Sequence, residues 1–232
     1  MPRVITSEQM RLAEQQVLDA DPDVDLMGRA ARAVADAATA FLSPNLARAD
    51  HRFPATPLES RPPDLDRRPA DAPRGRVLVA VGPGNNGGDG LFAAAILAEH
   101  HDVAVWLTSN RAHPGGLDAA RDAGVREVDA ATALEELEET HLVIDAVLGI
   151  GGRPGLTGEV AEFARACESA HVTVISVDLP SGLDADSGDV RGVTFRARRT
   201  VTFAALKPCH ITPPASDRCG RVVVADIGIP LP

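Results

Sequence analysis

The strongest constraint on the fold is a regular alternation that begins near Arg76. Short apolar runs rich in valine and isoleucine alternate with longer segments of helical character, at about 90–99, 116–124, 131–140 and 159–170. Such runs are typical of strands buried on both faces, and their alternation with helices predicts a mostly parallel sheet. The expected fold class is α/β, a Rossmann-like three-layer αβα sandwich. The predicted strands are 77–81, 103–107, 142–145, 172–177, 200–203 and 222–225.

Two further helices are predicted ahead of the sheet, as an N-terminal helical arm. Thr6 or Ser7 can cap the first helix, and the breaker sequence 21–23 ends it. The second helix is expected from about Asp25 to Leu42.

The stretch from about 43 to 75 interrupts this pattern with seven prolines among arginine, aspartate and alanine. Such a composition cannot hold a helix or bury much surface. We therefore predict a single domain over 1–232 with a Pro-rich, flexible insertion at about 43–75.

Composition narrows the function classes. The formal net charge is −10 and no basic cluster is present, which disfavours nucleic-acid binding. No apolar run approaches the roughly 18 residues of a membrane span, and residues 1–6 lack a signal-peptide core. The three cysteines are an odd number without metal-ligand pairing and suggest free thiols in a reducing compartment. We expect a cytoplasmic protein with no membrane or nucleic-acid partner.

The first chemically suggestive group follows strand 77–81. Residues 82–90 contain five glycines and satisfy the dinucleotide pattern G-x-G-x-x-G, which is weak evidence alone. Asn85, Asn86 and Asp89 are more informative, because dinucleotide turns seldom need three polar side chains. They could bind a cation or fix ribose and amide groups. The alternative is a tight turn with an Asx cap.

Two more groups follow strands 142–145 and 172–177. Asp145 precedes a glycine-rich loop, and Asp178 is followed by Ser181 after a proline turn. Ligands of such sheets bind at the carboxyl ends of the strands, where all three groups are expected. Asp145 could instead cap its turn. Ser181 lies in no G-x-S-x-G elbow and has no evident histidine partner, so a serine hydrolase is disfavoured.

Lys207 is the single lysine of a chain with 22 arginines, and it follows strand 200–203. Its ammonium group could act as a point charge or a proton donor. The alternative is that Lys207 has no special role and remains by chance in an arginine-biased composition.

In order and spacing, these residues resemble the NAD(P)H-hydrate epimerase family, also called the YjeF N-terminal domain. The similarity covers nearly everything outside 43–75 and corresponds to a stand-alone form without the dehydratase domain. It rests on 7–11, 26–27, 77–97, 143–149, 177–186, 202–203 with 207–208, and 224–230.

The resemblance implies an enzyme that interconverts the R and S forms of hydrated NADH and NADPH (NADHX and NADPHX) for cofactor repair. It implies a potassium ion as cofactor, held by Asn86, Asp145 and Ser181. From the expected acid/base chemistry at C6 of the nicotinamide ring, we hypothesise Asp178 as the catalytic group, tuned by Lys207 or the cation. The implied substrate contacts are Asn85, Asn86, Gly87, Gly88, Asp89, Gly149, Ile150, Gly151, Gly152, Arg153, Pro154, Gly155 and Asp178.

Partners follow from the same resemblance. The fused dehydratase of many relatives is not in this sequence, so we expect a separate ADP- or ATP-dependent dehydratase. The N-terminal helical arm could mediate a homodimer. The chain departs from the family at Ile150, where threonine is common, at Cys209, where glycine is common, and at 28–31, which many relatives replace with a polar sequence.

Two other functions stay open. A NAD(P)-dependent oxidoreductase would need an acid at the end of the second strand. That strand ends in 107–111, which could tolerate a 2′-phosphate but offers no carboxylate for the ribose. A non-catalytic nucleotide-binding or scaffold module on the same fold is the other alternative.

Overall fold

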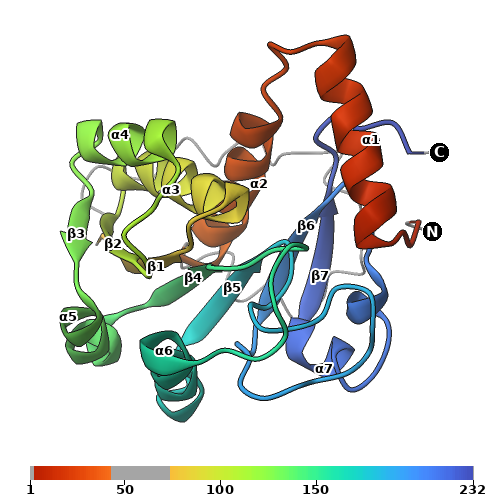
Figure 1. Cartoon of the computed structure of the whole chain (residues 1–232). Coiled ribbons are helices and arrows are strands. Elements are labelled where there is room, and N and C mark those ends of the chain that lie inside the picture. Colours follow the sequence, from red (N-terminus) through yellow and green to blue (C-terminus); the bar gives the residue numbers. More distant parts are fainter. Residues whose placement is uncertain (1–2, 43–73, 232) are drawn as a thin grey trace.

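The computed structural model describes residues 3–42 and 74–231, which form a parallel sheet flanked by helices (Figure 1). The seven strands follow the order β3-β2-β1-β4-β5-β6-β7, and every neighbouring pair is parallel. From β1 the chain adds β2 and β3 on one side and then β4 to β7 on the other, so the strand order switches between β1 and β4. Ligands bind at such a switch point in sheets of this kind. The strands are β1 Arg76–Val81, β2 Asp102–Leu107, β3 Arg126–Val128, β4 Leu142–Ala146, β5 Thr173–Val177, β6 Arg199–Phe203 and β7 Arg221–Ala225.

Helices cover both faces of the sheet, which confirms the predicted three-layer αβα sandwich (Figure 1). In β1, Val77 and Val79 face one core, and Leu78 and Ala80 face the other. This alternation explains why the strand is apolar at every position. On the first face lie α2 Leu26–Leu42, α3 Asn85–Ala98 and α4 Pro114–Asp122, and on the second lie α5 Ala130–Glu135, the 3₁₀ turn η1 Glu136–Glu139 and α6 Gly158–Ser169.

The N-terminal helix α1 Ser7–Ala20 lies near β6 and β7 (Figure 1), and its Met10 and Ala13 are buried in the core of the first face. Thr6 caps it as predicted: the Gln9 amide N–H donates to the Thr6 hydroxyl, and the Thr6 N–H donates to the Gln9 side chain. The Ile5 N–H donates to the Leu206 carbonyl over 2.9 Å, and the Ser7 N–H donates to Asp186 Oδ1 over 2.7 Å. These bonds attach the helix to the segments that follow β5 and β6. Two short elements, η2 Pro208–His210 and α7 Ser216–Cys219, lie between β6 and β7.

Helix α3 differs most from expectation. The sequence predicts its start near Gly90, but the helix begins at Asn85 with Gly84 as N-cap. The glycines that suggest a loop belong to its first turns, where the backbone passes very close to its neighbours. A Cβ on Gly87 would lie 2.0 Å from the Gly82 carbonyl oxygen. The polar side chains are therefore held on a helix rather than a turn.

Strand β3 is the second difference, since no strand is predicted there. Its three residues are exposed or half-buried at the sheet edge, so no apolar run marks them. The helix expected at 131–140 divides into α5 and η1.

Two expectations concern other segments. The predicted insertion at about 43–75 lies outside the described residues except for Arg74 and Gly75, so it stays a prediction. Among the helices of 3–42 and 74–231, none has the length and apolar character needed to cross a bilayer.

Candidate active site

A cavity of about 490 Å³ opens at the carboxyl edge of the sheet. Its floor comes from the segments that follow β1, β4 and β5, and α1 and the residues after β7 supply the remaining wall. All three groups expected at this edge contribute to one cavity, together with residues from both ends of the described chain, but Asp145 and Ser181 do not line it. Its lining is Met10, Arg11, Glu14, Pro83–Asn86, Asp89, Val147–Gly152, Asp178, Phe203, Lys207, Ile227 and Ile229.

Asp178 and Lys207 form a buried ion pair in this cavity. Lys207 Nζ donates to Asp178 Oδ1 over 2.6 Å, and both side chains are almost fully enclosed. Nζ also lies 2.7 Å from the Thr202 hydroxyl and 3.3 Å from the Phe203 carbonyl oxygen. These three acceptors match the three protons of the ammonium group. Lys207 thus directs its positive charge at Asp178.

The backbone of Asp178 is unusual, with φ = 66° directly after β5. This left-handed conformation is uncommon outside glycine and asparagine and marks many functional sites. The Ile150 N–H donates to Asp178 Oδ2 over 3.2 Å, and His210 Nε2 donates to the Asp178 carbonyl over 3.0 Å. His210 Nδ1 accepts from the Lys207 N–H, so the imidazole is the neutral Nε2–H tautomer. One carboxylate oxygen is thus bound to Lys207 while the other lies beside the 149–152 loop.

The carboxyl groups of the cavity have opposite pKa shifts. Burial favours a higher pKa for Asp178, but the charge and hydrogen bond of Lys207 outweigh it and hold the pKa below its ordinary value. Burial and the Asp178 charge raise the pKa of Asp89 well above its ordinary value. The same two causes raise the pKa of Glu14. The cavity therefore combines an ionised carboxylate with carboxyl groups that hold protons more tightly.

Asp145 and Ser181 meet beneath the cavity. Asp145 is fully buried and accepts from the Ser181 hydroxyl at 2.5 Å, the Ser181 N–H at 2.8 Å and the Ser176 hydroxyl at 2.8 Å. Burial raises the pKa of Asp145 to about 6, although these hydrogen bonds lower it. The Leu148 N–H donates to the Ser181 hydroxyl over 2.8 Å, so the pair also anchors the loop after β4.

Asn86 lies in the lining of the cavity, which does not include Asp145 or Ser181. A Cβ on Gly149 would lie 3.1 Å from Asn86 Oδ1 and 3.2 Å from Asp178 Oδ2, so the loop passes closely by both. Asn86 Nδ2 is buried and has no hydrogen-bond partner within residues 3–42 and 74–231. Of the residues predicted to hold a cation, Asn86 lines the cavity, whereas Asp145 and Ser181 are fully buried outside its lining. No group of three or more His, Cys, Asp or Glu suited to a metal occurs in the described part.

The predicted substrate contacts fall into two sets. Asn85, Asn86, Asp89, 149–152 and Asp178 line the cavity. The others lie outside its lining. Gly87 and Gly88 pack against the chain around them, and Gly155 donates its N–H to the Gly182 carbonyl; Arg153 and Pro154 complete this set.

Helix α1 supplies cavity residues that the sequence analysis missed. Met10 and Glu14 stand one turn apart and point into the cavity, and Arg11 Nη2 donates to the Ile150 carbonyl over 3.0 Å. Their spacing at i and i+4 could have indicated a shared face. Thr202 and His210 surround the ion pair, and the sequence analysis gave neither of them a role: Thr202 entered only as part of the family resemblance, and His210 belongs to none of its motifs. Ile150, one of the three departures from the family pattern, contacts Asp178 through its backbone N–H.

The sheet order, with the glycine-rich start of α3 and a cavity at its switch point, defines a Rossmann-like α/β protein. Comparison with known proteins gives the particular family. Residues 23–209 match the family described as YjeF-related protein N-terminus, and the chain belongs to that family.

Curated relatives of two kinds are similar to the chain. The NAD(P)H-hydrate epimerase of Limosilactobacillus fermentum is 31% identical, covering 97% of this chain and 96% of the relative. The protein of the same name from Clavibacter sepedonicus is 40% identical, with 70% and 76% covered. The bifunctional NAD(P)H-hydrate repair enzyme Nnr of Corynebacterium glutamicum is 35% identical over 99% of this chain. The chain spans only 39% of that longer enzyme.

A crystal structure of yeast ynu0 has the same fold. Its TM-score is 0.65 at 22% sequence identity, with 89% of this chain and 82% of the yeast chain covered. At this identity the likeness supports the α/β fold alone.

Proposed function

We propose that the chain is an NAD(P)H-hydrate epimerase that interconverts the R and S forms of NADHX and NADPHX. The observation that carries the proposal is the buried Asp178–Lys207 pair, which opens into a cavity beside the glycine-rich start of α3. A relative with this name matches 97% of the chain. Helix N-termini with exposed N–H groups favour the phosphates of such a substrate.

The reaction requires the C6 hydroxyl to leave from one face of the nicotinamide ring and water to return to the other. Loss of the protonated hydroxyl as water leaves a planar iminium, and addition of water then needs a base. Asp178 is suited to be that base, since Lys207 keeps it ionised. Its Oδ2 is the oxygen that Lys207 does not engage. Lys207 is a positioning residue in this proposal, because its three protons are already bound.

The departing hydroxyl needs a proton donor. Asp89 and Glu14 share the cavity with Asp178 and have raised pKa values, so they hold protons that Asp178 has lost. Pairs of titratable groups whose pKa values are pushed apart commonly divide the acid and base roles. We assign the acid role to Asp89, the more deeply buried of the two carboxyl groups. The proton that Asp178 takes from the incoming water returns to Asp89 through solvent.

A potassium ion near Asn86, Asp145 and Ser181 is part of the proposal. Amide, carboxylate and hydroxyl oxygens are hard donors that suit an alkali cation. The unpartnered end of the Asn86 amide supports a ligand there, since exchange of its nitrogen and oxygen would present an oxygen instead. When bound, the cation would supply positive charge beside the substrate. Replacing potassium by tetramethylammonium should lower both turnover and the melting temperature if this is right.

The first experiment incubates the protein with R-NADPHX and follows both epimers by chromatography against a protein-free control. Faster approach to the same epimer ratio is expected. Asp178→Asn should lower the rate by at least about a hundredfold, because it removes the base. Asp217→Asn, an exposed carboxylate on α7, is the matched control. Ligand binding without turnover in the unmodified protein would indicate a scaffold module instead.

The remaining expectations complete the proposal. A separate ADP- or ATP-dependent dehydratase would consume the S epimer, as the bifunctional relatives combine repair steps in one chain. A cytoplasmic location is supported by three cysteines that are all free and buried, as expected in a reducing compartment. A homodimer through α1 is supported by Leu12, which is 58% exposed on that helix. Light scattering of the protein and its Leu12→Glu variant tests the dimer.

A further inference from the structure

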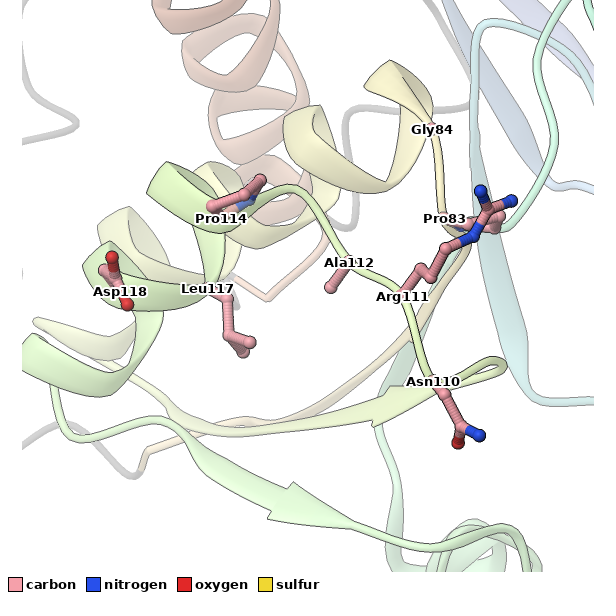
Figure 2. A pocket seen from close by; sticks show the side chains of 8 residues that line it. All are labelled: Pro83, Gly84, Asn110, Arg111, Ala112, Pro114, Leu117 and Asp118. Atoms are coloured by element: carbon pink, nitrogen blue, oxygen red, sulfur yellow. The ribbon is translucent and has the colours of Figure 1, made fainter.

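A second cavity, of about 600 Å³, adjoins the candidate active site (Figure 2). It lies between the loop that follows β2 and helix α4. Pro83 and Gly84 line both cavities, so the two meet at the N-cap of α3. The residues around it are Pro83, Gly84, Asn110, Arg111, Ala112, Pro114, Leu117 and Asp118.

Arg111 is the only cationic residue in this lining. Its backbone is held by Ser109, whose hydroxyl donates to the Arg111 carbonyl over 2.9 Å and accepts from the Arg111 N–H at 3.3 Å. Figure 2 shows its side chain extending toward Pro83. Within the described residues, its guanidinium has neither a hydrogen bond nor an ion pair to a side chain. An unengaged guanidinium at the junction of two cavities is suited to an anion.

The positions of the two cavities on the sheet indicate which part of a dinucleotide each one would bind. Strand β2 lies beside β1, and the Thr108 hydroxyl donates to the Val81 carbonyl, so the β2 loop is fixed next to the α3 N-terminus. With the nicotinamide ring at Asp178 and the diphosphate at α3, the adenosine reaches the β2 side. An acid at the end of this strand recognises a free ribose 2′-hydroxyl, whereas an arginine accommodates a 2′-phosphate. Residues 107–111 contain Arg111 and no acid.

We propose that the cavity beside β2 is the adenosine subsite and that Arg111 binds the 2′-phosphate, so that NADPHX is preferred to NADHX. The inference rests on the proposed function for the identity of the whole substrate. Ala112, Pro114 and Leu117 offer an apolar surface for the adenine ring. Asp118 lies at the opposite side of the group from Arg111, away from the phosphate (Figure 2).

Binding of fragments tests the subsite without any turnover. Calorimetry at fixed ionic strength would compare adenosine 2′,5′-bisphosphate with AMP, which differ only in the 2′-phosphate. The bisphosphate should bind at least about tenfold more tightly, the contribution of one hydrogen bond to a charged group. Arg111→Ala should abolish the difference and Arg111→Lys should retain part of it. Arg165→Ala, an exposed arginine on α6, should leave it unchanged.

The outcomes separate this inference from the proposed function. Equal affinity for both fragments, no binding of the bisphosphate at millimolar concentration, or an unchanged preference in Arg111→Ala overturns the subsite. If the fragments are discriminated through Arg111 but no epimer is turned over, the subsite stands and the proposed function fails. If the protein is active, Arg111→Ala should raise KM for NADPHX and leave KM for NADHX unchanged. An unchanged ratio of the two KM values overturns the inference while the activity stands.

Discussion

Lys207 determines the charge state of Asp178. Replacing it with methionine roughly keeps the volume of the side chain but leaves the buried carboxylate of Asp178 without its cation. Loss of one partner of a buried pair costs about 3–5 kcal/mol. In the unmodified protein the pKa of Asp178 is depressed, so its stabilising effect is present above the ordinary value of 3.8 and lost as the pH falls.

For Lys207→Met, the free energy of unfolding in urea should therefore fall most at neutral pH and less under acidic conditions, where Asp178 is protonated. The double variant Asp178→Asn/Lys207→Met removes both charges and should recover much of the loss. A single variant as stable as the unmodified protein at pH 7 would contradict the role assigned to this pair.

The pKa of Asp89 is shifted upward, opposite to that of Asp178. Because its folded-state pKa is raised, its contribution to stability is present below the ordinary value of 3.8 and lost as the pH rises through the folded-state pKa. Asp89→Asn should thus stabilise the protein at neutral pH while lowering epimerase turnover by about a hundredfold, the usual effect of losing a general acid. Urea unfolding at neutral and acidic pH measures the first effect and the epimer assay the second.

The matched control is Asp122→Asn, an exposed aspartate on α4, which should change neither quantity. If Asp89→Asn destabilises the fold at neutral pH, the carboxylate is ionised and well paired, and the acid role is wrong.

At the scale of elements, the glycines of α3 are required by close packing. A Cβ on Gly90 would lie 2.4 Å from the Ala146 side chain of β4. Alanine favours a helix over glycine by about 0.5–1 kcal/mol, but overpacking of a tight core costs about 1–3 kcal/mol. Gly90→Ala should therefore destabilise the protein. Gly115→Ala in α4, where the nearest atom is 3.7 Å away, should be neutral or slightly stabilising. Thermal unfolding of both variants makes the comparison.

Those glycines also show where prediction from sequence ends. The buried strands were predictable because β-branched runs such as 77–81 have few alternatives to a central parallel strand. The start of α3 was not, since the turn signal of its glycines is cancelled by contacts with Gly82 and Ala146 that only the folded chain provides. Strand β3 was missed because an exposed edge strand needs no apolar run.

For the candidate site, strand ends predicted which loops meet, so Asn86, Asp89 and Asp178 were placed at one cavity. The roles given to them stay predictions. Glu14 was not found, because nothing local shows that α1 folds back over the sheet edge. Thr202 was missed for a similar reason: its contact with Lys207 depends on the course of the chain after β6.

At the scale of the whole molecule, the cavity is bounded by both ends of the described chain. Met10 and Glu14 come from α1, and Ile227 and Ile229 come from the segment after β7. The Arg3 side chain donates to the Leu231 carbonyl over 3.1 Å, which joins these ends directly. The matched family segment, 23–209, includes neither end.

Because α1 forms part of the cavity wall, its local stability should depend on whether a ligand occupies the cavity. A ligand that touches both α1 and the sheet adds its binding free energy to the docking of the helix, which raises the cost of local opening by mass action. Amide hydrogen exchange in α1 should therefore slow when substrate binds, while α6, on the far face of the sheet, should exchange at an unchanged rate. Equal protection of both helices would mean that the ligand stabilises the fold globally. Selective protection of α1 would show that the substrate itself holds the first helix against the sheet.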